Sequence, residues 1–361
     1  MFEKKSIYIA GPECFYTSGF EILDAMRRRS ESLGFSVTLP NDDPLNLDNE
    51  ELQKNADEIF KNCAKSMNES TVIIADLEAF RGSEPDNGTI YELGMAYAKG
   101  IRCYGYTRDK RNVLWKNQRA VLRDNVVYDE TGRVHPYSDL PFSPSIIGST
   151  KIVEGDFDDC LKMLMTDIEE DYKEKAKRSI YTDNSNKVTI EKGDKPIVYL
   201  SDSIRYDSDG IEKYQVMKEI CKKYDLEVIT PLDIANGVKK IVTENPYVRA
   251  ANEFDNYQQH VRNCDIIIAD LNDFRGYESC NDVGFECGMA FQLGKKLYGY
   301  MDDTSSMKKQ IPNYSNSGKD MCGSNVENFD YPINLMFASS MKIFRGKFEE
   351  VIKDIVKDIK K

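Results

Sequence analysis

The sequence is poor in the residue type on which many catalytic and metal sites depend. Its 361 residues include only two histidines, His135 and His260. A Ser-His-Asp triad needs a histidine beside its nucleophile, and a multi-histidine metal site needs several in one place. Both arrangements are therefore nearly excluded. If this protein performs acid–base chemistry, carboxylates must carry it.

Cysteines are present, but not in the patterns that build covalent or metal frameworks. None of the nine forms a C-x-x-C pair, and several lie in apolar stretches, as Cys103 does. We interpret them as reduced, buried residues and not as disulfides or zinc ligands.

Long apolar runs and a basic face are also missing. No run approaches the roughly 20 apolar residues that cross a bilayer, so we expect no membrane partner. The N-terminal stretch passes from two lysines straight into a strand-like run without a signal-peptide pattern, which predicts a cytoplasmic protein. A net charge of −12 argues against nucleic acid as a partner.

What the sequence does contain is an internal repeat. Residues 73–106 and 267–300 align without a gap at a constant offset of 194 residues, which points to a duplicated domain. The copies share an aspartate, an FRG arginine and a glutamate followed by x-Gly-Met-Ala, at Asp76/Asp270, Arg81/Arg275 and Glu92/Glu286. Six residues before that glutamate they differ, because the first copy has Asp86 and the second has Cys280.

Strand-like and helix-like segments alternate in each half, which predicts βαβ crossovers and parallel sheets. We expect strands at 6–10, 35–39, 71–76, 101–106, 196–200, 226–230, 265–270 and 296–300, and helices at 19–33, 51–67, 88–99, 209–224, 247–262 and 282–293. The predicted fold class is α/β, with two tandem flavodoxin-like (Rossmann-like), doubly wound parallel-sheet domains packed as a pseudo-dimer. The predicted domains are 1–170 and 196–361, joined by a charged linker at 171–195.

Ligands of open parallel sheets bind outside the carboxyl ends of the strands, where three segments of the first repeat should meet. Gly11 and Pro12 follow the first strand, the segment from Asp76 to Arg81 follows the third, and Asp86 and Gly88 open the helix that carries Glu92. Taken singly, Asp86 could be only a helix cap and Glu92 only a complement to the helix dipole.

In combination, these segments resemble the nucleoside 2-deoxyribosyltransferases. The motifs are YIAGP, IADLEAFRG, D-N-G-T-x-x-E-L-G and a C-terminal NLM, and they cover nearly all of the first repeat and most of the second. The resemblance implies that Glu92 is the nucleophile, that Asp86 handles the leaving base and that Tyr8 orients Glu92. Asn62 is the nearest match to a sugar-contacting residue, with local spacing that differs by one. The implied substrate-binding set is Gly11, Pro12, Asn62, Asp76, Arg81, Gly88, Asn334 and Met336.

The implied chemistry suits carboxylates. Deoxyribose C1′ ionises readily, since no 2′-hydroxyl withdraws electrons from the oxocarbenium-like transition state. Glu92 could capture C1′ as an ester while a second carboxyl protonates the base, and a new base would then attack with net retention. The expected partners are a nucleoside and a free nucleobase, without cofactor or metal.

The family resemblance also implies that each site is built from two subunits, here fused in one chain. The NLM segment, Asn334 to Met336, survives only in the second repeat, whereas the first repeat has Ser143-Pro144-Ser145 at the aligned positions. The complete site therefore pairs Tyr8, Asp86 and Glu92 with Asn334 and Met336. The site with Glu286 and Cys280 is expected to be degenerate, the alternative being that both sites work.

Two other functions stay open on the sequence. One is an N-glycoside hydrolase that acts on nucleosides or nucleoside monophosphates with water as acceptor. The other, less favoured, is a nucleoside-binding scaffold without turnover. A further homo-oligomer of the pseudo-dimer is also left open.

Overall fold

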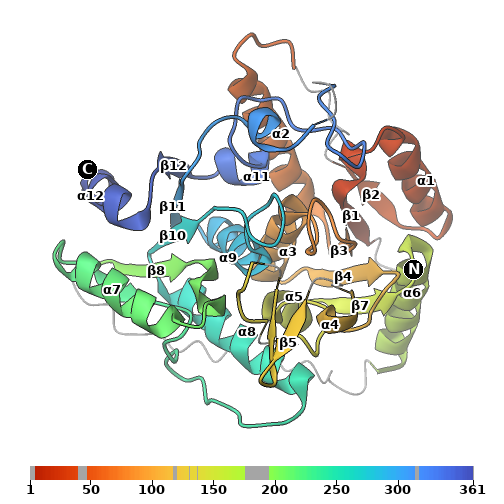
Figure 1. The fold of residues 1–361 in the computed structure, drawn as a ribbon. Coiled ribbons are helices and arrows are strands. Elements are labelled where there is room, and N and C mark those ends of the chain that lie inside the picture. Colours follow the sequence, from red (N-terminus) through yellow and green to blue (C-terminus); the bar gives the residue numbers. More distant parts are fainter. Residues whose placement is uncertain are drawn as a thin grey trace.

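Two parallel sheets of five strands form the centre of the molecule, one in each half of the chain (Figure 1). The computed structural model describes residues 5–39, 47–116, 120–129, 131–135, 137–174, 195–313 and 317–360. The first sheet has the order β2-β1-β3-β4-β7 and the second the order β9-β8-β10-β11-β12. Both are the 2-1-3-4-5 order of flavodoxin-like folds. The predicted fold class is thereby confirmed.

The strands lie where the sequence predicted them, and each half has a fifth strand that it did not predict. The first sheet contains β1 (Ser6–Ala10), β2 (Ser36–Thr38), β3 (Val72–Asp76), β4 (Arg102–Thr107) and β7 (Lys151–Glu154). The second contains β8 (Ile197–Ser201), β9 (Glu227–Ile229), β10 (Ile266–Asp270), β11 (Lys296–Met301) and β12 (Lys342–Arg345). A small hairpin pairs β5 (Val121–Arg123) with β6 (Val126–Tyr128).

Eight long helices cover the sheets in the described parts of the chain. The first half has α1 (Gly19–Ser32), α2 (Leu52–Glu69), α3 (Asn87–Lys99) and α6 (Phe157–Glu174). The second has α7 (Gly210–Lys222), α8 (Pro246–Asn263), α9 (Asn281–Gln292) and α12 (Phe348–Ile359). The shorter helices are η1 (Pro12–Phe15), α4 (Val113–Lys116), α5 (Pro144–Ser149), η2 (Ser203–Tyr206), α10 (Met307–Gln310) and α11 (Leu335–Ala338). Among the described residues, no helix has the length and apolar character needed to cross a bilayer.

Alternation along β1 sends its side chains into two different cores. Ile7 and Ile9 pack with the outer helices α1 and α6, whereas Tyr8 and Ala10 face the inner core. That inner core is shared by both halves, since Tyr8 and Tyr199 belong to one continuous cluster. The two halves therefore form a fused pseudo-dimer, and the fully buried Tyr8 points toward its interface.

The closest approach of the halves is the crossing of α3 and α9 at the centre of Figure 1. A Cβ on Gly94 would lie 2.1 Å from the carbonyl oxygen of Phe285, and one on Gly288 would lie 1.9 Å from that of Tyr91. Only glycine lets the two backbones come so near. Each glycine stands two residues after a repeat glutamate, so this crossing fixes where Glu92 and Glu286 lie.

The predicted domain boundaries are only partly within the described residues. Helix α6 runs to Glu174 and β8 begins at Ile197. Most of the predicted linker, residues 175–194, lies outside the described residues. The limits 1–170, 171–195 and 196–361 remain predictions.

Substituting the crossing glycines tests how tightly the halves are joined. We expect Gly94→Ala to lower the free energy of unfolding by about 1–3 kcal/mol or more, because the added methyl meets backbone that cannot rotate away. Gly288→Ala should cost a similar amount, since its neighbour is the symmetry-related carbonyl. Urea denaturation at 25 °C measures both values. Wild-type stability in either variant would contradict so close a crossing.

Candidate active site

The first site is organised by the start of α3. Asp86 is the N-cap of this helix, and its Oδ2 accepts hydrogen bonds from the backbone N–H and the Oγ1 of Thr89, both at 2.7 Å. Glu92 follows one and a half turns later and turns its carboxyl toward β1. There the hydroxyl of Tyr8 donates a short hydrogen bond to Glu92 Oε1. The structure thus brings together Tyr8 and Glu92, as the resemblance implied.

Burial makes these carboxyls unusually weak acids. Glu92 is 8% exposed, and burial raises its pKa to about 8 against the opposing hydrogen bond from Tyr8, with the charge of Asp86 adding to the effect. Burial also raises the pKa of Asp86, while its bonds to Thr89 act in the other direction. Asp86 Oδ1 has no hydrogen-bond partner among the described residues. The pair can therefore offer both a proton and, once ionised, a nucleophilic oxygen.

The second half closes this site. Helix α11 packs against α2 and α3, and its N-cap Asn334 lies so close to Gly88 that a Cβ there would be 2.7 Å from Asn334 Nδ2. The Asn334 side chain also accepts a hydrogen bond from Met336 N at 2.9 Å, and Met336 is buried. The NLM segment of the second repeat therefore lies over the helix start of the first.

A residue bonded to that segment, Glu327, was not predicted from the sequence. The half-buried Glu327 accepts a hydrogen bond from Leu335 N at 2.9 Å through Oε2. Burial raises the pKa of Glu327 to about 8, its bond to Leu335 N opposes this, and the charge of Asp86 adds to it. No motif contains Glu327, and only the fold carries it across to the first half.

The turn after β1 holds a second unpredicted carboxyl. Glu13 folds back over Gly11, where a Cβ would lie 2.0 Å from Glu13 Oε2. Tyr106 donates a hydrogen bond to Glu13 Oε1 at 2.8 Å. Burial and then the charge of Asp76 raise the pKa of Glu13 to about 8. Gly11 therefore makes room for a side chain of this protein, and Pro12 begins the short helix η1 that carries Glu13.

Helix α2 supplies a thiol to the site. Burial raises the pKa of the Cys63 thiol, and the charge of Glu92 adds to this effect. A hydrogen bond with Tyr8 acts in the other direction. Asn62, the residue singled out by the resemblance, is buried one position earlier on the same helix. Its role at the sugar stays a prediction.

Arg81 is bonded to the second half of the chain through two of its three guanidinium nitrogens, while Nη1 lies 3.6 Å from Glu278 Oε1 without a hydrogen bond. It donates through Nε to Asp320 at 3.1 Å and through Nη2 to the carbonyl of Asn325 at 2.7 Å. Its guanidinium also lies over the rings of Phe15 and Phe80. This arrangement ties the loop after β3 to the tail of the other half.

Arg275 repeats this arrangement in the second half, with Asp129 and Glu84 each at 3.0 Å. Both arginines have a positive φ, 52° at Arg81 and 54° at Arg275. The two FRG motifs therefore act as matching joints between the halves.

The second site has the same framework but is occupied by its own side chains. Tyr199 donates to Glu286 Oε1 at 3.0 Å, as Tyr8 does to Glu92. Unlike Glu92, however, Glu286 is held by the buried Arg205, whose two terminal nitrogens lie 2.7 and 2.8 Å from its carboxylate oxygens. Ser201 adds a further hydrogen bond to Oε2. Both oxygens of Glu286 are thus engaged.

Substitutions around Glu286 account for this closure. Arg205 stands at the position of Cys14 in the first half, and Asp282 at that of Gly88. Asp282 accepts hydrogen bonds from Ser145 N at 3.1 Å and from the hydroxyl of Tyr206, whereas the equivalent Gly88 has no side chain and lies against Asn334. Cys280 is buried at the helix start and makes no side-chain cap bond.

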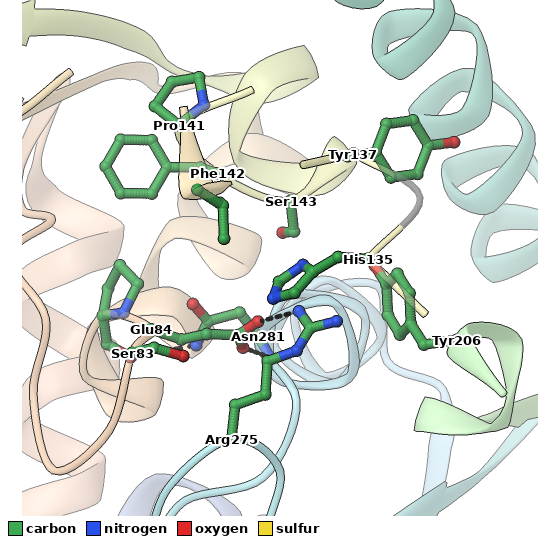
Figure 2. Close-up of a pocket in the computed structure, with 12 residues that line it drawn as sticks. Ser83, Glu84, His135, Tyr137, Pro141, Phe142, Ser143, Tyr206, Arg275 and Asn281 are labelled. Carbon is green, nitrogen blue, oxygen red and sulfur yellow. Dashed lines mark hydrogen bonds and ion pairs between the residues drawn. The ribbon is translucent and has the colours of Figure 1, made fainter. Parts of the chain in front are cut away.

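A small cavity beside the second site is too small to hold a nucleoside. Figure 2 shows it between His135, Ser143, Tyr206 and the Glu84–Arg275 ion pair. Its volume of about 30 Å³ suits one or two water molecules, not a nucleoside. Burial, with the charge of Arg275, lowers the pKa of His135 to about 3, so the ring is neutral.

Within the described ranges, no three His, Cys, Asp or Glu side chains are grouped to hold a metal ion.

The contrast between Glu92 and Glu286 predicts opposite effects of removing their charges. The folded-state pKa of Glu92 lies above the ordinary value of 4.5, so its stabilising contribution is full below pH 4.5 and is lost as pH rises through about 8. Glu92→Gln should therefore change the free energy of unfolding in a pH-dependent way. Relative to wild type, the variant should be more stable at pH 8.5 than at pH 5.5, by roughly 1–3 kcal/mol.

The matched control is Glu286→Gln, which leaves Arg205 buried without its partner and should cost about 3–5 kcal/mol. Denaturant unfolding at pH 5.5 and 8.5 measures both. Equal pH dependence of wild type and Glu92→Gln would contradict the raised pKa.

The chain is similar to known proteins in both sequence and structure. A family model described as nucleoside 2-deoxyribosyltransferase matches residues 7–145 and again residues 198–336. No curated protein sequence matches. Among solved structures, the chain is similar to a 2-desoxiribosyltransferase from Leishmania mexicana, at 29% identity and a TM-score of 0.36, over 45% of this chain and 97% of that one.

Another similar structure is a CMP N-glycosidase from Clostridium botulinum, at 15% identity and a TM-score of 0.23, over 45% of this chain and 98% of that one. The two family matches together span well over half of the chain and cover one repeat each. The chain therefore belongs to the nucleoside 2-deoxyribosyltransferase family, with two copies of the family domain in tandem.

Proposed function

We propose that the protein transfers 2-deoxyribose from a 2′-deoxynucleoside to a second nucleobase, at the composite site of Tyr8, Asp86 and Glu92. Family membership supports glycosyl transfer or hydrolysis at a nucleoside. The observation that carries the finer proposal is the difference between the two glutamates. Among the described residues, Glu92 accepts a side-chain hydrogen bond from Tyr8 alone, whereas Glu286 is bonded by Tyr199, Ser201 and Arg205.

In the first half-reaction, an ionised oxygen of Glu92 attacks C1′ of the deoxyribose. The bond between C1′ and the base nitrogen breaks, its electron pair goes to the base, and a carboxyl proton neutralises the base as it leaves. Tyr8 holds the nucleophile through Oε1, which leaves the other oxygen for attack. Because Glu92 is buried, its charge is poorly solvated before attack and is consumed when the ester forms.

In the second half-reaction, a new base nitrogen attacks C1′ of the glycosyl ester. The C1′–O bond breaks, Glu92 becomes a carboxylate again, and the proton of the incoming base returns to the neighbouring carboxyl. Two displacements at C1′ give net retention. Asn334 and Met336 exclude water during the interval, because α11 covers the start of α3.

The charges around Glu92 favour a nucleoside over a nucleotide. Asp86, Glu13 and Glu327 all place carboxyls near the site, and Arg81, whose charge acts on Asp86 and Glu327, is bonded to Asp320 and Asn325. A 5′-phosphate would bring a dianion toward this group of buried carboxyls, where further negative charge is disfavoured. The expected substrate therefore carries no phosphate.

A direct assay separates transfer from hydrolysis. The protein is incubated with 2′-deoxyinosine and free adenine, and the products are separated. We expect 2′-deoxyadenosine and hypoxanthine. Hypoxanthine with free deoxyribose and no new nucleoside would instead establish the hydrolase, and no turnover with retained binding would establish the scaffold.

Trapping with a 2-fluoro-2-deoxynucleoside then locates the nucleophile without any substitution. Peptide mass mapping should find the label on Glu92. Label on Glu286 would overturn the assignment.

The Glu92→Gln variant should lose transfer by at least about a thousandfold, because it lacks the nucleophilic oxygen.

Transplanting the closure of the second site into the first tests why one site works. Cys14→Arg should lower the rate of transfer by at least about a hundredfold, because the new guanidinium would pair with Glu92 as Arg205 pairs with Glu286. Cys14→Ser is the control and should change the rate less than threefold. A Cys14→Arg variant that folds normally and keeps wild-type activity would contradict the role assigned to Arg205.

A further inference from the structure

The position of Glu327 connects it with the first site and not with the second. It lies on the second half, yet its Oε2 accepts from Leu335 N in the segment that covers the first site. The neighbouring residue of that segment, Asn334, touches Gly88, two residues from Asp86. Finally, the aligned position in the first repeat is Pro136, so the closed second site has no equivalent acid.

Asp86 is poorly suited to hold the proton by itself. Its Oδ2 accepts two hydrogen bonds from Thr89 at the positive end of α3, and both features favour the ionised form. Glu327 accepts one hydrogen bond, through Oε2, from Leu335 N. Because the charge of Asp86 opposes the ionisation of Glu327, a proton held by the pair resides on the group with less support for its charge.

We propose that Glu327 is a catalytic residue that donates the proton to the departing nucleobase, with Asp86 as the ionised acceptor that orients the base. This rests on the proposed function. As the C1′–N bond breaks and its electron pair moves to the base, the Glu327 O–H bond breaks and its proton bonds to a ring nitrogen. Glu327 is left as a carboxylate and recovers a proton from the incoming base.

Other titratable and charged groups surround this acid. Asp86, Cys14, Cys63 on α2 and Arg81 after β3 interact with its charge from the first half, and Glu278 does so from the second half. Glu278 has a symmetric counterpart in Glu84, and each accepts the first backbone N–H of the opposite helix, at Asn87 and Asn281. Because each half has one such glutamate, the pair does not distinguish the two sites.

The test variant is Glu327→Gln, which keeps an oxygen for Leu335 N but has no acidic proton. For 2′-deoxyguanosine, kcat/KM should fall by roughly 10²- to 10⁴-fold, the range of general acid catalysis. For 7-methyl-2′-deoxyguanosine, whose base is already cationic and leaves without a proton, the fall should be less than threefold. Glu244→Gln removes an exposed carboxyl and is the control for net charge.

The pH profile provides a second readout on the natural deoxynucleoside that wild type cleaves fastest. The wild-type kcat/KM should rise as Glu92 ionises and fall above about pH 8 as Glu327 loses its proton. Glu327→Gln should lose the falling limb only. Equal losses on both guanosine substrates, or an unchanged pH profile, would overturn the role of Glu327 while transfer stands. A wild type that cleaves no nucleoside would refute the proposed function and the proton donor together.

Discussion

The close crossing of α3 and α9 is the constraint on which the rest of the structure depends. Gly94 and Gly288 allow each helix to rest on a carbonyl of the other, and each lies two residues after a repeat glutamate. The crossing therefore brings both glutamates to the boundary between the halves. Since neither half can complete a pocket there by itself, the walls must come from the opposite tail. This is why Asn334 lies over Gly88 and Ser145 binds Asp282.

Fusion of the two domains lets the equivalent sites diverge. In a symmetric dimer, any change at one site would appear at the other, whereas a tandem chain can alter each copy separately. Here the first copy has Cys14, Gly88 and an acidic Glu327 across the boundary, and the second has Arg205, Asp282 and Pro136. The same backbone thus carries one site whose glutamate is bonded by Tyr8 and one whose glutamate is held in an ion pair with Arg205.

Periodicity, which is a local property, predicted four strands of each sheet and six of the long helices, while the meeting of Tyr8 with Glu92 was implied by the family resemblance. The sequence did not predict Arg205 or Glu327. Arg205 stands where the other repeat has Cys14, so alignment showed a difference without showing that the guanidinium folds back onto Glu286. Glu327 belongs to no motif, and its place depends on how the tail crosses the boundary. The sequence also could not reveal that Arg81 is engaged by Asp320 and Asn325.

The two sites differ in how their buried carboxyl groups are stabilised. At the second site, Arg205 and two hydroxyls are bonded to Glu286, which is stable but leaves no oxygen free to react. At the first, burial raises the pKa of Glu92, Asp86 and Glu327, and the charge of Asp86 adds to the effect at the other two. That arrangement costs stability above neutral pH and retains protons below it. A reaction that consumes the charge of one carboxylate and takes a proton from another carboxyl requires carboxyls with raised pKa values. At the second site, Arg205 removes this electrostatic cost, and the reactive carboxyl is lost with it.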